Sequence, residues 1–127
     1  MTARATILSV DDDEDLRQLV GEVLTSAGYR VLSAESGEAA LRFLESDERI
    51  DLIVTDVVMP GLNGMALARQ ARRLRPEVRV LFSSAYWPYI VTEPAEHDVV
   101  RKPYLPKQLV DRVRRTLSAV ESDQAAS

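Results

Sequence analysis

The chain has 127 residues, of which 46% are hydrophobic and 28% are charged, so we expect one globular domain over residues 1–127. A formal net charge of -4 lacks the basic excess of a nucleic-acid binder, and the absence of cysteine excludes disulfides and thiolate metal sites. No apolar run is long enough to cross a bilayer, so we expect a cytoplasmic protein without membrane or nucleic-acid partners.

Strand and helix patterns alternate from the start of the chain. The apolar run at residues 6–10 predicts a buried strand, and the acidic run 11–15 follows it directly. Apolar residues at helical spacing over 16–27 then predict an amphipathic helix that Gly28 ends. Residues 29–34 predict the second strand.

The middle of the chain repeats this pattern around a carboxylate. A second, shorter helix is predicted over the segment AALRFL, with Ser36 as its N-cap. Residues 52–54 form a continuous apolar run, which is typical of a strand covered on both faces, and this strand leads into Asp56. Turn-forming residues at 60–64 stop the strand, so Asp56 is predicted at its C-terminal end, where open α/β sheets bind ligands.

The last third of the chain predicts two more strands and two helices. A helix begins at Gly64 and ends before Pro76, and the strand at 78–82 leads into Ser83 and Ser84. A very short fifth strand at 99–100 precedes Lys102, and Pro106 begins a final amphipathic helix. We place the core at about 5–120 and expect a frayed polar tail over 121–127.

Five strand–helix units predict an α/β fold: a doubly wound, five-stranded parallel sheet in the order 2-1-3-4-5. That order sets the C-terminal ends of strands one, three, four and five side by side. It therefore gathers five residues along one edge of the sheet: Asp11, Asp12, Asp56, Ser84 and Lys102.

This predicted row of side chains indicates phosphoryl chemistry. Three neighbouring carboxylates repel one another, and oxygen-only ligands favour Mg²⁺, with Mn²⁺ as the other option, over zinc. A lysine and a small hydroxyl are expected beside them if a phosphoryl group visits the site. Mg²⁺ and Lys102 would then neutralise its oxygens, Ser84 would hydrogen-bond one of them, and Asp56 would attack.

Four motifs in order, ILSVDDDEDLR, LIVTDVVMPGLNG, VLFSSA and VRKPY, resemble the receiver (REC) domain of the two-component response regulator family. The resemblance covers nearly the whole length and implies a flavodoxin-like (βα)5 fold. It implies a phosphoacceptor that takes a phosphoryl group from a phosphohistidine of a histidine kinase or histidine phosphotransfer protein. Output is then expected by contact with a downstream protein or by phosphorelay.

The resemblance assigns a role to each site residue. Asp11 and Asp12 match the acidic pair that binds the metal, Asp56 the phosphoacceptor, Ser84 the switch hydroxyl and Lys102 the invariant lysine. It also implies that the backbone carbonyl at position 58, a valine, coordinates the metal, and that the peptide between 102 and 103 is cis.

The expected activity is that of a regulator, not an enzyme: self-phosphorylation and slow autodephosphorylation only. By the same resemblance, Val58 and Tyr86 flank the path of the water that removes the phosphoryl group. Val58 offers that water no hydrogen bond, and the Tyr86 ring would shield the phosphorus, so in-line attack is disfavoured.

Three other functions match part of the same residue pattern, and each conflicts with another feature of the sequence. A haloacid dehalogenase-like phosphohydrolase would use Asp11 as nucleophile and Asp13 as acid, but Glu14 stands where that pattern has a small residue, and the chain has no length for a cap domain. A calcium-binding EF-hand loop is excluded because Leu16 takes the place of its glycine. A degenerate receiver, acting as a binding module without phosphorylation, conflicts with the complete set of site residues.

The sequence departs from the family pattern in two places. The switch aromatic of the family falls where this chain has Val99, so the usual coupling through a rotating ring is not expected. The interval between Ser84 and Lys102 is short and contains Pro88 and Pro94, which predicts a fourth helix that is short or irregular.

Overall fold

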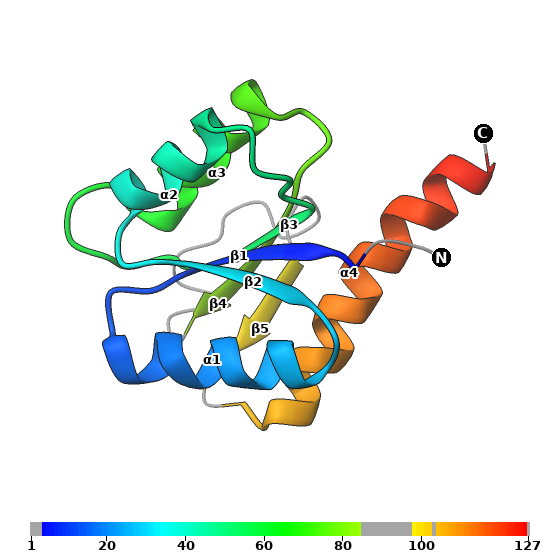
Figure 1. Ribbon diagram of the computed structural model, residues 1–127, viewed down its shortest axis with the longest axis horizontal. Helices are drawn as coiled ribbons and strands as arrows, with labels where there is room; N and C mark the ends of the chain where they lie inside the picture. Colours follow the sequence, from blue (N-terminus) through cyan, green and yellow to red (C-terminus); the bar gives the residue numbers. More distant parts are fainter. Residues whose placement is uncertain (1–3, 85–97, 103, 127) are drawn as a thin grey trace.

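The computed structural model describes residues 4–84, 98–102 and 104–126 (Figure 1). Five parallel strands form one sheet in the order β2-β1-β3-β4-β5, which confirms the predicted doubly wound topology. The strands are β1 Thr6–Val10, β2 Arg30–Ala34, β3 Leu52–Asp56, β4 Arg79–Ser84 and β5 Asp98–Arg101.

Helices cover both faces of this sheet. They are α1 Glu14–Ser26, α2 Gly37–Glu45, α3 Gly64–Leu74 and α4 Pro106–Ala126. Helices α2 and α3 lie on one face, and α1 and α4 lie on the other (Figure 1). The helix expected to be short or irregular, between β4 and β5, falls at 85–97, outside the described residues.

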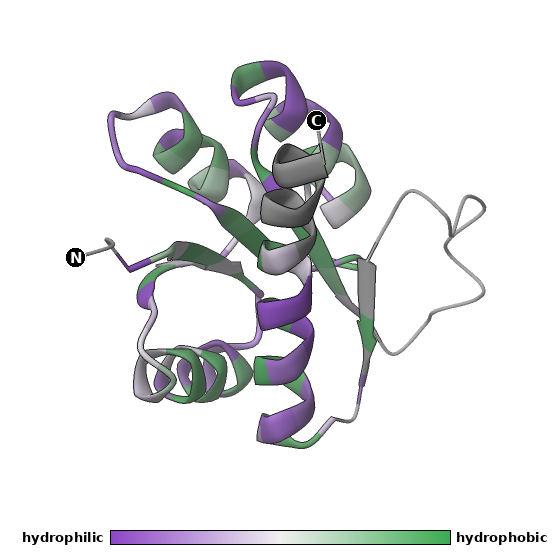
Figure 2. Cartoon of the chain, turned by 90° about the vertical axis from the view of Figure 1, so that its right-hand side faces the viewer, coloured by the Kyte–Doolittle hydropathy of each residue, from purple (hydrophilic) through white to green (hydrophobic). Residues whose placement is uncertain are grey.

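Two apolar clusters, one on each face, hold these layers together. The first packs α2 and α3 against the sheet and includes the fully buried Leu67 and Phe82. The second packs α1 and α4 against the other face and includes the fully buried Leu24, Leu81 and Leu109. Strands are hydrophobic along most of their length and lie between helices whose outer faces are polar (Figure 2). This is the pattern expected of a parallel sheet buried on both sides.

The capping residues predicted from the sequence are confirmed. The Ser36 side chain accepts a hydrogen bond from the Ala39 N–H at the start of α2. At the end of α1, Gly28 adopts φ 100°, and the Tyr29 N–H reaches back to the Leu24 carbonyl. This left-handed turn is one that glycine adopts without strain, so it ends the helix where the sequence indicates.

Several boundaries differ from the expectation, and two of the differences have a clear cause. Strand β4 runs on to Ser84, because its ladder with β5 continues to the pair Ser84 and Arg101. Helix α4 continues through the polar segment that we expected to fray and ends at Ala126. No glycine or proline follows Pro106, and glutamate, glutamine and alanine are good helix formers, so nothing in the segment stops the helix.

In the part of the chain that the structure describes, we find no helix with the length and apolar character that crossing a membrane requires.

Candidate functional site

The site begins at the loop after β1, which fixes the position of Asp11. Its side chain accepts a hydrogen bond from the Asp13 N–H at 2.9 Å, and its carbonyl accepts one from the Arg17 guanidinium at 2.9 Å. Asp11 is only 5% exposed, whereas the neighbouring Asp12 is exposed. The loop therefore presents one buried and one open carboxylate at the C-terminal edge of the sheet.

Asp13 has a different role in the same loop. Its side chain accepts a hydrogen bond from the Leu16 N–H at 3.1 Å and caps α1. A carboxylate at this position satisfies a backbone N–H of the first helical turn that has no partner within the helix. The structure thus gives Asp13 a role at the start of α1.

Asp56 stands at the end of β3, directly across the ladder from Ser83 on β4. The Thr55 hydroxyl donates to the Asp56 carbonyl at 2.9 Å. The loop then folds back, and the Gly64 N–H donates to the Val57 carbonyl at 2.9 Å, so that α3 begins against the strand it follows. The Asp56 side chain is 15% exposed and can be reached from solvent.

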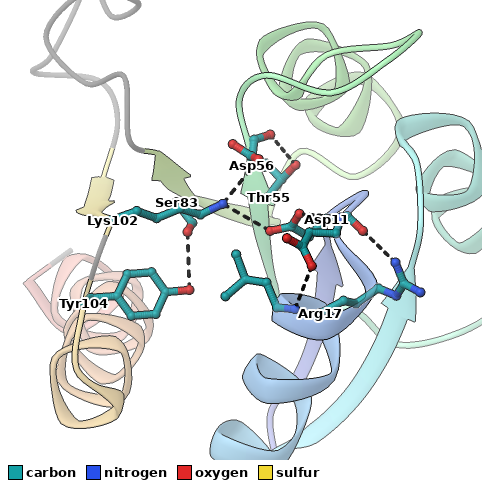
Figure 3. A network of polar contacts seen from close by, with 9 residues as sticks. Asp11, Arg17, Thr55, Asp56, Ser83, Lys102 and Tyr104 are labelled. Atoms are coloured by element: carbon teal, nitrogen blue, oxygen red, sulfur yellow. Dashed lines mark hydrogen bonds and ion pairs between the residues drawn. The ribbon is translucent and has the colours of Figure 1, made fainter.

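Lys102 connects these two carboxylates from the far side of β4. It follows β5, and its Nζ lies 3.3 Å from Asp11 Oδ2 and 3.3 Å from Asp56 Oδ2 (Figure 3). The ammonium therefore links the C-terminal ends of β1, β3 and β5, and it lies above the end of β4. Its side chain is 18% exposed, so bulk water screens these ion pairs only partly.

Three carboxylates form a cluster that could hold a metal ion. Asp11, Asp12 and Asp56 each offer an oxygen atom, and these atoms all lie within 4.8 Å of one another. Carboxylate oxygens with an open, solvent-facing side suit a hard divalent cation that keeps some of its waters. The residues present therefore fit the cation that the sequence predicts.

The charges of the site act on one another. Burial raises the pKa of Asp11 above its usual 3.8, although the hydrogen bond from Asp13 and the Lys102 charge oppose the rise. Burial alone would lower the pKa of Lys102, but Asp11 and Asp56 outweigh it and raise that pKa above 10.5. At neutral pH the Lys102 ammonium stays charged. The hydrogen bond from Asp13 and the charge of Lys102 do not fully offset the cost of burying the ionised Asp11 carboxylate.

The structure brings together Asp11, Asp12, Asp56 and Lys102 as the sequence predicted. The backbone of Ser84 ends β4, one residue beyond the ladder partner of Asp56. Val58 follows Asp56 by two residues, and 54% of its surface is exposed. The predicted cis peptide involves residue 103, which lies outside the described residues, and Val99 is described by its backbone in β5.

Two residues near the site were not singled out from the sequence. Ser83 is buried, with 3% exposed, and its hydroxyl donates to the Tyr104 hydroxyl at 3.4 Å (Figure 3). A signal for Ser83 was present, because side chains alternate between the two faces along β4, and Ser83 lies on the same face of the sheet as Asp56. Tyr104 is the last residue of the VRKPY motif, but nothing in its spacing indicates a contact with Ser83.

Comparison with known families and proteins gives a consistent result. The model of the response regulator receiver domain matches residues 7–114. The response regulator receiver protein CpdR of Brucella abortus is 31% identical, over 89% of this chain and 97% of its own length. The sensor kinase CckA of the same organism is 33% identical over 92% of this chain, which spans only 13% of that protein.

Solved structures agree with these relatives. A CheY-like response regulator receiver domain protein from Methanospirillum hungatei superimposes with a TM-score of 0.86 at 26% identity, and the match covers 95% of this chain and 99% of that one. The receiver domain of the hybrid histidine kinase CckA gives a TM-score of 0.77 at 34% identity, covering 89% and 99%.

Proposed function

Because the chain belongs to the response regulator receiver domain family, we propose that Asp56 is its phosphoacceptor and that Lys102 neutralises the incoming phosphoryl group. Receiver domains are the phosphoacceptor signalling domains of two-component systems; they act with histidine kinases, and they are regulators, not classical enzymes. The single observation that carries the proposal is the Lys102 ammonium, 3.3 Å from both Asp11 and Asp56.

We propose Mg²⁺ as the cation and assign its ligands to Asp11, Asp12, Asp56 and the backbone carbonyl of Val58. Mn²⁺ has the same preference for oxygen and is an acceptable substitute. When bound, the cation would withdraw charge from the phosphoryl oxygens. The cluster of three carboxylate oxygens supports this assignment.

The chain's own residues supply the rest of the reaction. A carboxylate oxygen of Asp56 attacks the phosphorus of a phosphohistidine, the new O–P bond forms, the N–P bond breaks, and the electron pair leaves with the imidazole. Lys102 offsets the charge on the phosphoryl oxygens, and Ser84 is proposed to hydrogen-bond one of them.

The proposed donor is a histidine kinase or histidine phosphotransfer protein, and the output passes to a downstream protein or along a phosphorelay. We also propose that residues 1–127 form a single receiver domain in the cytoplasm, without membrane or nucleic-acid partners. The apolar, exposed Val58 supports slow autodephosphorylation, because its side chain cannot orient a water molecule.

Incubation with acetyl phosphate and Mg²⁺, followed by mass spectrometry of the peptides, tests this proposal. The wild-type chain should gain one phosphoryl group on the peptide that contains Asp56, and Asp56→Asn should gain none. Asp47→Asn is the matched control. It changes an exposed carboxylate that precedes β3, at the opposite end of the strand from Asp56, and it should react like the wild type. Phosphorylation of Asp56→Asn at the wild-type rate would remove Asp56 from the role.

Lys102→Met adds a second arm to this experiment. It keeps the apolar stem and removes the ammonium, and we expect phosphorylation at saturating Mg²⁺ to slow by about 100-fold. The half-saturating Mg²⁺ concentration should not rise, because the ammonium and the cation compete for the same carboxylates. A rise would mean that Lys102 only supports the fold of the metal site.

A further inference from the structure

Two hydroxyl groups lie under the charged site, and the proposed reaction uses neither. Ser83 is the ladder partner of Asp56 on β3 and of Val100 on β5. Tyr104 packs its ring against the apolar cluster on the face of α1 and α4. The two hydroxyls meet at 3.4 Å, and both side chains point into the space beneath Lys102 (Figure 3).

Lys102 needs support that the sheet does not supply. The ladder between β4 and β5 ends at Arg101, so the backbone of Lys102 lies beyond the last paired residue. Its side chain must nevertheless cross the end of β4 to reach Asp11 and Asp56. Holding a long, flexible side chain in one conformation costs entropy, so the position of its backbone decides how often the ammonium reaches the carboxylates.

We propose that Tyr104 is a positioning residue, whose hydroxyl, paired with Ser83, holds the Lys102 segment against β4 and keeps the ammonium between Asp11 and Asp56. This inference rests on the proposed function, in which Lys102 acts on the phosphoryl group. Ser83 belongs to the strand that Lys102 crosses, and Tyr104 lies two residues after Lys102. Their contact therefore joins the two sides of that crossing.

The chemistry of this pair favours a positioning role over simple packing. The surrounding cluster is apolar, and alanine and phenylalanine would fill the same space there without any polar group to satisfy. Ser83 is buried and Tyr104 is half-buried, so taking their hydroxyls out of water costs desolvation, and the pair stabilises one arrangement only when the two meet. Burial raises the pKa of Tyr104 above 10.0, so the hydroxyl keeps its proton at neutral pH.

The test compares Tyr104→Phe, Ser83→Ala and the double variant in the acetyl phosphate reaction, with Mg²⁺ varied. Each single variant should phosphorylate about threefold more slowly at saturating Mg²⁺, as expected for one lost hydrogen bond. The double variant should be no slower than the slower single variant, because the two hydroxyls act through each other. The half-saturating Mg²⁺ concentration should not rise.

Tyr29→Phe is the matched control, since Tyr29 packs against the same cluster but precedes β2, at the opposite edge of the sheet. It should react like the wild type. A wild-type rate for Tyr104→Phe, or a rise in half-saturating Mg²⁺, would overturn the positioning role; Ser83→Ala decides the point alone if Tyr104→Phe does not fold. Absence of phosphorylation in the wild type would instead refute the proposed function.

Discussion

At the scale of single residues, Gly64 shows how closely the backbone packs beside the proposed phosphoacceptor. A Cβ atom at position 64 would lie 2.1 Å from the Asp56 carbonyl oxygen and 3.0 Å from the Val57 Cα. Both neighbours are backbone atoms, which cannot rotate away. At Gly21, in the middle of α1, the corresponding position has no atom within 4 Å apart from the chain neighbours and the backbone of its own helix.

We therefore expect Gly64→Ala and Gly21→Ala to change stability in opposite directions. Gly64→Ala should lower the free energy of unfolding by about 3 kcal/mol, because the end of β3 or the start of α3 must move. Gly21→Ala should raise it by about 0.5–1 kcal/mol, since alanine loses less backbone entropy in a helix. Urea unfolding monitored by circular dichroism measures both, and equal effects would contradict the close approach at Gly64.

At the scale of elements, Arg75 joins the ends of α2 and α3. Its guanidinium donates to four carbonyls around the C-terminus of α2: Phe43 at 3.4 Å, Leu44 at 3.1 Å, Ser46 at 2.6 Å and Glu48 at 2.5 Å. These carbonyls lie at a helix end, where intrahelical partners run out and the helix dipole favours a cation. Arg75 thus caps one helix from the end of another.

Arg75→Ala should lower the free energy of unfolding by about 2 kcal/mol, because several charge-assisted hydrogen bonds are lost together. Arg75→Lys should recover only part of this loss, since one ammonium cannot match the planar fork. Arg73→Ala, at an exposed position on the same helix, should change stability by less than about 0.5 kcal/mol. Thermal and urea unfolding measure the stability of the three variants. If Arg75→Lys were as stable as the wild type, the capping role would be contradicted.

At the scale of the whole molecule, the site and the stability of the fold are linked. Asp11, Asp56 and Lys102 come from three strands, so their charges are brought together only when the sheet forms. The pKa of Asp11 is raised by burial. The folded chain without metal therefore binds this proton more tightly than the unfolded chain, and the free energy of unfolding falls as pH rises from 3.8 through the folded-state pKa.

Asp11→Asn should accordingly be more stable than the wild type at pH 7 without metal, and the difference should vanish below pH 3.8. The amide oxygen can still accept the hydrogen bond from Asp13. Adding Mg²⁺ should reverse the order, because it stabilises the wild type by about 1.4 kcal/mol at a concentration about tenfold above its dissociation constant. Urea unfolding with and without Mg²⁺ measures this, and an Asp11→Asn variant that Mg²⁺ stabilises equally would exclude Asp11 as a ligand.

Much of this molecule is determined by local sequence. Alternating strand and helix patterns, the caps at Ser36 and Asp13 and the stop at Gly28 depend on residues close together in the chain. The strand order follows because parallel strands need crossover helices and these have one hand. The gathering of Asp11, Asp56 and Lys102 at one edge then follows from that order.

Tertiary structure decided what depends on contacts between distant segments. Arg75 reaches carbonyls about thirty residues away, and the Ser83–Tyr104 contact joins a strand to the start of a helix. Local patterns cannot specify such pairs, because nothing in the spacing of their residues indicates which side chains will meet. The sequence by itself determined the fold and the carboxylates and lysine of the site; how deeply Asp11 is buried, and what supports Lys102, became visible only when the strands and helices packed together.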